Sequence, residues 1–571
     1  MKLRNSIGLP VIMVLMISGC SLPNESSKTA STKEARQSIN AEAQTIDDLV
    51  EDRKVYDNDK ADSIINLYVT VLSEPGQGTF HTMNHWYDTG ENQGDPPKLS
   101  AIVQEGSPDG PQKDSWGYGT DAANSSIEIR GNTSRLVPQK SYQIKLAKSA
   151  GLWHGQTSID LNKHYGDLTR VRQKLSFDMF KEIPNITSLR TQFVHLHVKD
   201  LTVDTPDKQF IDYGLFTHVE QPNKRFLYNH GLDPNAHLYK ATLFEFFRYP
   251  EQLKLATDPK YNKKEFDKVL QIKGSEDHEK LIKMLDAVND YKQNINNVIE
   301  KYFNRENYLT WLASNLLMAN IDTDAQNFYL YSPLNSNKFY FLPWDYDAAW
   351  GQQAEETEIH PGFTAKWQLG ISNYWGSVLH RRFLKDPKNL EDLGKKVEEV
   401  AKILNKEKIK ELTDKYLPIA NQYVKNPPDL NWLPYKVENF GKSYESLVNI
   451  PEQNKDTYYK SLENPMPIYL DDPKFENGAY SFAWDSSYDF QGDDLTYDFQ
   501  VSQSIDFSSV YVEQKGLTIT SAKVPQNQLR TGKNYWRVIV KDSKGHTQIA
   551  FDRLKGDDNI WYNGQKEFIT K

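Results

Sequence analysis

The chain has 571 residues, of which 38% are hydrophobic and 12% are aromatic. This composition supports sizeable cores and excludes wholesale disorder or a collagen-like chain. Its 68 basic and 77 acidic residues give a net charge of −9, so the whole chain carries no electrostatic footprint for nucleic acid. A single cysteine excludes an intrachain disulfide and a cysteine-based zinc site. The length predicts two or three domains of about 100–200 residues each.

The N-terminus has the pattern of a secretory signal. Residues 1–5 are basic, residues 7–17 are apolar, and Ser18-Gly19-Cys20 follows. The apolar run is shorter than the roughly 20 residues that a membrane-spanning helix needs. Small residues ending in cysteine resemble the bacterial lipoprotein signal, which implies cleavage before Cys20 and lipid modification of that residue. An ordinary signal peptide that contains a cysteine by chance is the alternative.

The next segments predict a tether and then a folded region. Residues 21–60 are rich in Ser, Lys, Thr and Glu in their first half and are expected to form a flexible tether after the signal peptide of residues 1–20. Period-two alternation and β-branched residues predict strands, and helical spacing predicts one helix. The strands are expected at 64–71, 126–130, 140–146, 193–198 and 213–219, the helix at 167–180, and a long loop at 90–112.

From about residue 264 helical spacing predominates. Helices are expected at 266–270, 278–288, 293–303, 305–318, 390–404 and 407–424, the last with a kink or break at Pro418, and a hairpin is expected from 328–331 and 339–342. Strands followed by helices predict an α+β arrangement of two lobes over residues 61–462, strand-rich to about residue 260. The cleft between such lobes is a common ligand site.

Residues 463–571 have a different pattern, with short alternating strands and turn signals between them. Strands are expected at 480–484, 495–502, 509–513 and 535–540, which predicts an all-β sandwich. Trp484, and Leu529 preceding Tyr535, resemble the core and tyrosine corner of a fibronectin type III-like domain. No catalytic pattern occurs here, so a spacer or binding module is favoured.

Two regions carry candidate chemistry. The first is the turn Gly131-Asn132 between Arg130 and Lys140, with Lys145 on the next strand. A glycine turn with free amides beside cations can bind phosphate, although a solvated surface hairpin fits the same residues.

The second region has acids at both ends of the predicted hairpin. Asp322, Asp324 and Asn327 precede it, and Asp345 and Asp347 follow it. Carboxylate and amide oxygens are ligands suited to Mg²⁺, and a further aspartate can take a proton from an attacking hydroxyl. Asx turns and caps are the alternative. Four aspartates in an apolar setting repel one another without a cation, so chemistry is favoured.

Together these motifs resemble the CotH family of spore-coat protein kinases. The matching pieces are residues 130–134 with 140–146, 213–221 with 225–227, 238–241, 320–331 and 343–347. The resemblance implies an atypical protein-kinase-like fold of two lobes, followed here by the fibronectin type III/Ig-like sandwich. It also implies ATP and a divalent metal, Mg²⁺ or Mn²⁺, as cofactors, and a spore-coat or cell-surface protein as phosphoacceptor.

The resemblance also implies residue roles. Asp322 would be the catalytic base, and Asn327 and Asp345 would bind the metal, with Asp347 as a candidate second ligand. Phosphate contacts would come from Arg130, Gly131, Asn132 and either Lys145 or Lys140, which lie on opposite strand faces; the cleft face is expected for Lys145. Glu220 would contact adenine, unless it is a surface acid.

The sequence therefore predicts a lipid-anchored extracellular kinase on the outer face of the bacterial membrane, acting as a monomer without nucleic acid. A catalytically silent surface binding or adhesion protein is the main alternative. A surface hydrolase that uses the paired acids is a weaker one.

Overall fold

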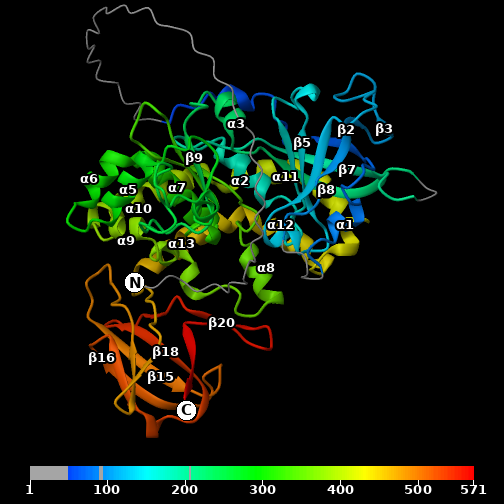
Figure 1. Cartoon of the computed structure of the whole chain (residues 1–571). Helices are drawn as coiled ribbons and strands as arrows, with labels where there is room; N and C mark the ends of the chain where they lie inside the picture. The colour runs from blue at the N-terminus through cyan, green and yellow to red at the C-terminus, as the bar shows by residue number, and fades with distance from the viewer. Residues whose placement is uncertain (1–48, 89–93, 205–207, 571) are drawn as a thin grey trace, which may run out of the picture. The chain divides into compact units, whose positions relative to one another are not determined.

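The computed structural model describes residues 49–88, 94–204 and 208–570 (Figure 1). The predicted signal peptide, Cys20 and residues 21–48 of the predicted tether lie outside the described residues. The rest of the chain is assigned to one compact unit, Thr45–Lys571. In the described part of the chain, no helix has both the length and the apolar character needed to cross a membrane.

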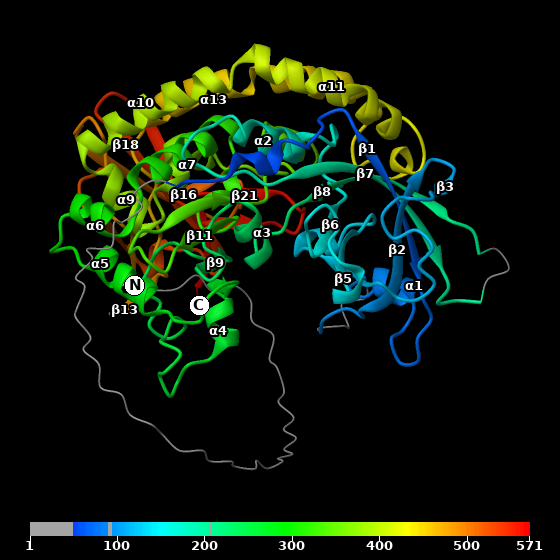
Figure 2. The ribbon, with the colours of Figure 1, turned by 90° about the horizontal axis from the view of Figure 1, so that it is seen from above.

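The N-terminal part is built on an eight-stranded sheet with the order β1-β7-β8-β6-β5-β4-β2-β3. Because β1 also pairs with β2, the sheet closes on itself. The two views show β1, β2, β7 and β8 side by side (Figure 2). The strands are β1 (Ile64–Val71), β2 (Leu99–Ser107), β3 (Gly110–Pro111), β4 (Ser125–Arg130), β5 (Ser141–Leu146), β6 (Ser158–Asn162), β7 (Thr191–Asp200) and β8 (Ile211–Val219).

Alternation along these strands produces the core. In β4, Ser125, Ile127 and Ile129 are buried, whereas Arg130 is half-buried and belongs to the opposite face. The expectation of a long loop at 90–112 was wrong, because this segment contains β2, paired with β1 and β4. The flanking Gly, Pro and Asp residues hide the short apolar run that forms this strand.

The second part combines a four-stranded sheet with helices. The sheet has the order β10-β9-β11-β12, from β9 (His237–Ala241), β10 (Leu270–Ile272), β11 (Phe328–Ser332) and β12 (Tyr340–Pro343). Helix α1 (Phe80–Asn84) belongs to the N-terminal part, where Phe80 and Met83 join the core of the sheet. The helices that follow are α2 (Arg172–Phe180), α3 (Lys224–Asn229), α4 (Lys263–Asp267), α5 (Glu279–Asn289), α6 (Ile295–Tyr302), α7 (Arg305–Met318), α8 (Gln352–Ile359), α9 (Val378–Leu384), α10 (Pro387–Ile403), α11 (Lys406–Val424), α12 (Phe440–Ser446) and α13 (Ile450–Leu462).

Helix α7 is the central buried element of this part. Asn304 caps it by accepting a hydrogen bond from the Asn307 amide, and Trp311 stacks on Phe341 of β12 with ring centroids 4.5 Å apart. The helix ends at Ala319, which adopts a left-handed conformation with φ of 49°. Helix α11 continues through Pro418, so the expected break there was wrong. Residues 266–270 also differ from expectation, because α4 ends at Asp267 and β10 starts at Leu270.

Residues after 463 form several small sheets. The strands are β13 (Lys474–Glu476), β14 (Ala479–Ala483), β15 (Leu495–Ser502), β16 (Val510–Leu517), β17 (Ser521–Pro525), β18 (Gly532–Asp542), β19 (Thr547–Ile549), β20 (Arg553–Lys555), β21 (Trp561–Asn563) and β22 (Gln565–Thr570). Phe482 of β14 packs against Phe499 and Trp536 of a second sheet, with ring centroids 4.9 and 5.0 Å away. Trp484 is buried, whereas Tyr535 is half-buried. The fold is therefore mixed α/β.

Candidate active site

Two loops bring the predicted acids together. One loop follows α7 and contains Asp322 and Asp324, and the other follows β12 and contains Asp345 and Asp347. The Asn320 side-chain amide donates to the Asp345 carbonyl oxygen at 3.2 Å and so joins the two loops. Because β11 and β12 pair from Phe328 to Tyr331, the acids before and after the hairpin meet at the same end of it.

The first loop is held by polar contacts to its neighbours. Residues Ile321–Thr323 form a short 3₁₀ helix. The Thr323 hydroxyl donates to the Asn320 carbonyl at 2.8 Å, and the Asn373 side chain donates to the Ile321 carbonyl at 2.9 Å. These bonds fix the backbone around Asp322, which is half-buried.

The acids perturb one another electrostatically. Burial, followed by the charges of Asp324, Asp347 and Asp345, raises the pKa of Asp322 to about 7. Burial and Asp347 raise the pKa of Asp345 to about 6, although Lys240 and Arg130 act in the opposite direction. Like charges in one site have this effect because each disfavours ionisation of the others. The cluster therefore has a deficit of positive charge.

Arg130 reaches this cluster from the end of β4. Its guanidinium donates to the Asn162 side-chain oxygen, lies 3.5 Å from the Asp160 carboxylate and lies 5.9 Å from the centroid of the Trp344 ring. Asn162 in turn donates to Gln173 of α2 at 2.7 Å, and Gln173 donates to the Asp345 carboxylate at 3.3 Å. A chain of hydrogen bonds thus links the N-terminal sheet to the acidic loop.

Lys240 is a second cation at the cluster, and its position in the sequence predicted no role for it. It lies on β9 directly opposite Tyr329 of β11, and its ammonium is 5.2 Å from the centroid of the Trp344 ring. Burial lowers its pKa to about 8, and the attraction of Asp345 opposes this shift. Its ammonium makes no hydrogen bond or ion pair with the described residues. The signal available in the sequence was a lysine among the apolar residues of the segment that forms β9, His237–Ala241.

The two lysines predicted to bind phosphate have different surroundings. Lys140 is buried, and its ammonium donates to Asp88 at 3.2 Å and to the Arg135 carbonyl at 2.9 Å. It therefore holds the loop rather than pointing to the acids. Lys145 is exposed, and its register opposite Ser126 puts it on the same sheet face as Arg130. Its role stays a prediction.

The remaining predicted residues have distinct surroundings. Gly131, with φ of 96°, and Asn132 are exposed in the turn after β4. Asn327 is half-buried directly before β11, with φ of 60°. Glu220 is buried, and its carboxylate lies 2.9 Å from the His230 ring and accepts a hydrogen bond from the Arg190 amide at 3.2 Å. These contacts give Glu220 a structural partner, and the adenine contact stays a prediction.

Three comparisons with known proteins are informative at different levels. The family model described as CotH kinase protein matches residues 127–458, more than half of the chain. The inner spore coat protein H of Bacillus subtilis (strain 168) is 27% identical over 233 residues. That match covers 40% of this chain and 59% of the relative, so the chain spans less than two thirds of the relative's length.

The structural comparison found a proinflammatory kinase, CtkA, of Helicobacter pylori. The match has 10% sequence identity and a TM-score of 0.25, and it covers 61% of this chain and 93% of that one. At this score the similarity carries no argument about the site.

Proposed function

The chain belongs to the CotH kinase family, and from that premise we propose that it transfers the terminal phosphoryl group of ATP to a hydroxyl group of a protein. The observation that supports this proposal is the arrangement of Asp322 and Asp345, on two loops joined by Asn320, with the cations Arg130 and Lys240 beside them. Phosphoryl transfer depends on positioning and on neutralisation of charge, and these residues can supply both.

The residues fit a divalent metal, Mg²⁺ or Mn²⁺. Burial, and after it the charges of the neighbouring aspartates, raises the pKa values of Asp322 and Asp345, and a cation would offset the repulsion between these carboxylates. The Asn320 side-chain oxygen is buried and accepts no hydrogen bond from the described residues. Asp345 and Asn327 would hold the ion, with Asp347 as a further oxygen ligand. When bound, the ion would neutralise phosphate charge.

The chain's own residues would then perform distinct tasks. Asp322 would accept the proton of the attacking hydroxyl, because its carboxylate lies close enough to Asp345 and Asp347 to feel their charge and therefore sits beside the proposed metal ligands. Arg130 and Lys240 would bind phosphate oxygens with charge-assisted hydrogen bonds. The amides of Gly131 and Asn132 would lie over the phosphates.

The test is ATP binding by calorimetry and phosphate transfer from labelled ATP, each with Mg²⁺ and with Mn²⁺. Asp322→Asn should lower turnover about 10²-fold or more with little loss of ATP affinity, because it removes the base but not a metal ligand. Asp345→Ala should lower turnover and also weaken ATP binding. Asp414→Asn, in an exposed ion pair with Lys410, is the control and should change neither.

If the wild-type chain neither binds ATP with either metal nor incorporates label, the kinase proposal fails. The chain would then be a catalytically silent surface binding protein on the same fold.

We also propose that this activity is located outside the cell. A lipid on Cys20 would anchor the chain to the outer face of the membrane. Residues 21–48 would act as the tether, because Glu51 and Asp59 in the rest of the predicted tether already contact the folded region. The residues after 463 would form a fibronectin type III-like spacer or binding module on a monomeric protein. The phosphoacceptor we propose is a spore-coat or cell-surface protein. Cys20→Ser should move the chain from the membrane fraction to the soluble fraction, and continued membrane retention of the processed variant would contradict the anchor.

A further inference from the structure

Three aspartates come together at one end of the C-terminal sheets. Asp489 and Asp493 lie in the loop before β15, and Asp542 ends β18. The register of the two strands pairs Leu495 with Asp542, so both loops are at the same end of the sheet. One carboxylate oxygen from each aspartate lies within 4.8 Å of the other two.

The loops hold two of these carboxylates rigidly. One oxygen of Asp489 accepts hydrogen bonds from the Gln491 and Asp493 amides at 2.9 and 3.0 Å. One oxygen of Asp542 accepts from the Lys544 and His546 amides at 2.9 and 2.8 Å. Each carboxylate is therefore oriented by its own turn. The second oxygen of Asp542 lies 2.7 Å from the His546 ring nitrogen, whereas that of Asp489 has no partner among the described residues.

The second oxygen of Asp489 is the independent sign of a ligand. Asp489 is only 6% exposed, and its Oδ2 is buried and accepts no hydrogen bond from the described residues. A buried carboxylate oxygen without a partner is costly, so such a group normally binds a donor or a cation.

The nearby basic side chains do not compensate for the three acids. Lys544 lies 2.9 Å from Asp493 and Ser543 donates to Asp493 at 3.4 Å, while His546 lies 2.7 Å from Asp542. The Lys544 side chain is 52% exposed, whereas that of Asp542 is fully buried. Neither base contacts Asp489 directly, so the buried side of the cluster keeps an excess of negative charge.

We propose that Asp489, Asp493 and Asp542 form a calcium site that is separate from the kinase site. Calcium accepts six to eight oxygen ligands at about 2.3–2.6 Å in irregular geometry, so oxygens on opposite sides of the ion lie about 4.6–5.2 Å apart. The three carboxylates fit around one such ion, and water would complete the shell. Magnesium demands near-ideal octahedral geometry and fits loop carboxylates less well.

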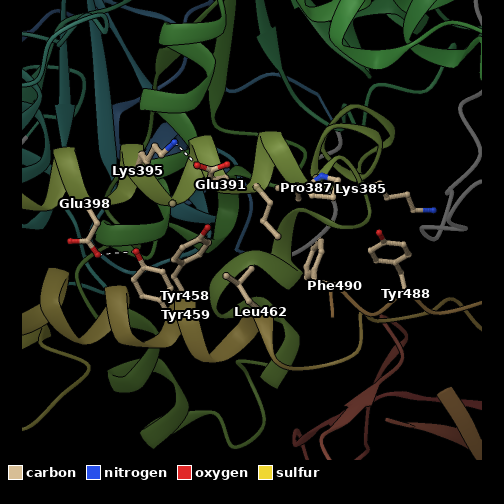
Figure 3. Close-up of a pocket in the computed structure, with 13 residues that line it drawn as sticks. Lys385, Pro387, Glu391, Lys395, Glu398, Tyr458, Tyr459, Leu462, Tyr488 and Phe490 are labelled. Atoms are coloured by element: carbon tan, nitrogen blue, oxygen red, sulfur yellow. Dashed lines mark hydrogen bonds and ion pairs between the residues drawn. The ribbon is translucent and has the colours of Figure 1, made fainter. Parts of the chain in front are cut away.

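The ion would fix a segment that packs against the kinase region. Tyr488 and Phe490 flank Asp489, and their rings lie 5.3 and 5.8 Å from that of Trp375. Both rings also line a groove of about 470 Å³ beside α10 and α13 (Figure 3). Calcium binding would therefore order one wall of this groove.

The test is calorimetric titration of the full-length chain with Ca²⁺, together with hydrogen exchange of residues 485–495. We expect one calcium site, and slower exchange of this segment when Ca²⁺ is present. Asp489→Asn should weaken Ca²⁺ binding at least tenfold and abolish the change in exchange. Asp494→Asn, an exposed aspartate next to the cluster, should leave both unchanged.

Two further variants show whether the ion binds at these three carboxylates. Lys544→Gln should strengthen Ca²⁺ binding several-fold, because the lysine competes with the ion for Asp493. Asp345→Ala, which affects the kinase site, should leave this binding intact. Equal Ca²⁺ binding by wild type and Asp489→Asn, weaker binding by Lys544→Gln, or a preference for Mg²⁺ would overturn the calcium proposal.

Discussion

Lys240 and Lys145 show how the surroundings of a lysine decide what it can bind. The ammonium of Lys240 is close to the Trp344 ring, and burial lowers its pKa although the charge of Asp345 acts in the opposite direction, whereas Lys145 is exposed on β5. A cation held beside the acids proposed to bind metal can reach a phosphate group at the same site. An exposed lysine is surrounded by water and gains less from the same contact.

We therefore expect Lys240→Ala to raise the dissociation constant of ATP at least tenfold, in line with about 1.5–3 kcal/mol for a hydrogen bond to a charged group. Lys145→Ala, at the position favoured by the sequence, should change it less than twofold. Calorimetry with Mg²⁺ present measures both. If Lys145→Ala raises the dissociation constant more than Lys240→Ala does, Lys145 rather than Lys240 contacts the phosphate.

The acids could be predicted from the sequence, but their partners could not. Asp322 and Asp345 flank a recognisable hairpin, so local patterns indicated that they meet. Arg130, Asn162 and Gln173 approach Asp345 through three different elements, and nothing in their spacing indicates that arrangement. It depends on how the N-terminal sheet packs on α2.

His230 links two distant parts of the chain through charge. Its two ring nitrogens lie 2.6 Å from Glu51 and 2.9 Å from Glu220. Burial lowers its pKa, but the two carboxylates outweigh burial and raise the pKa to about 9. The folded state therefore holds this proton more tightly than the unfolded chain, whose histidines titrate near pH 6.5.

This shift predicts a pH-dependent contribution to stability. The contribution is complete below about pH 6.5 and is lost as the pH rises through about 9, because the neutral ring no longer pairs with two carboxylates. His230→Asn should cost roughly 3 kcal/mol below pH 6.5 and clearly less at pH 10. Urea unfolding of both proteins across this range measures the difference, and a constant difference would contradict the assignment.

At the scale of elements, one short 3₁₀ helix, Asp429–Trp432, holds the N-terminal sheet. Asp429 is fully buried, lies 2.9 Å from the Lys163 ammonium and accepts a hydrogen bond from the Leu215 amide at 2.9 Å. Lys163 also donates to the Tyr213 carbonyl at 2.7 Å. No sequence pattern predicted this contact, because its partners lie more than 200 residues before Asp429.

Removing the charge of Asp429 should destabilise the chain strongly. We expect Asp429→Asn to cost roughly 3–5 kcal/mol, because it leaves Lys163 buried without its counter-charge. Asp414→Asn, in the exposed pair with Lys410 on α11, should cost less than about 1 kcal/mol. Urea unfolding at one pH measures the loss in free energy of unfolding for each variant. Equal losses would show that the buried pair of Asp429 and Lys163 stabilises the fold no more than the exposed pair does.

At the scale of the whole molecule, the C-terminal sheets have their own core but also contact the kinase region. Trp367 and Phe551 have ring centroids 4.9 Å apart, and Trp375 stacks on Tyr488 at 5.3 Å. The Trp561 amide donates to the Pro361 carbonyl at 3.0 Å. The strand pattern of the sequence predicted a separate domain. It could not predict these contacts, because local alternation carries no information about residues that lie far apart in the chain.

A chain that ends after Glu463 should keep ATP binding within about twofold, because every residue assigned to the kinase site precedes residue 350. Its melting temperature should fall by several degrees, since Trp367 and Trp375 lose apolar partners. Titration calorimetry measures the ATP affinity, and scanning calorimetry measures the melting temperature. An unchanged melting temperature would show that the two regions are energetically independent, and lost ATP binding would show that the boundary is wrong.

The contact between Asp429 and Leu215 also sets an order of events during synthesis. Translation proceeds at about 5–20 residues per second, so the 214 residues between the two positions take about 10–40 s to make. During that interval the Lys163 ammonium has no counter-charge to bury against, and the sheet that carries Arg130 stays incomplete. The N-terminal sheet is consequently completed only after the helices that follow it have been made.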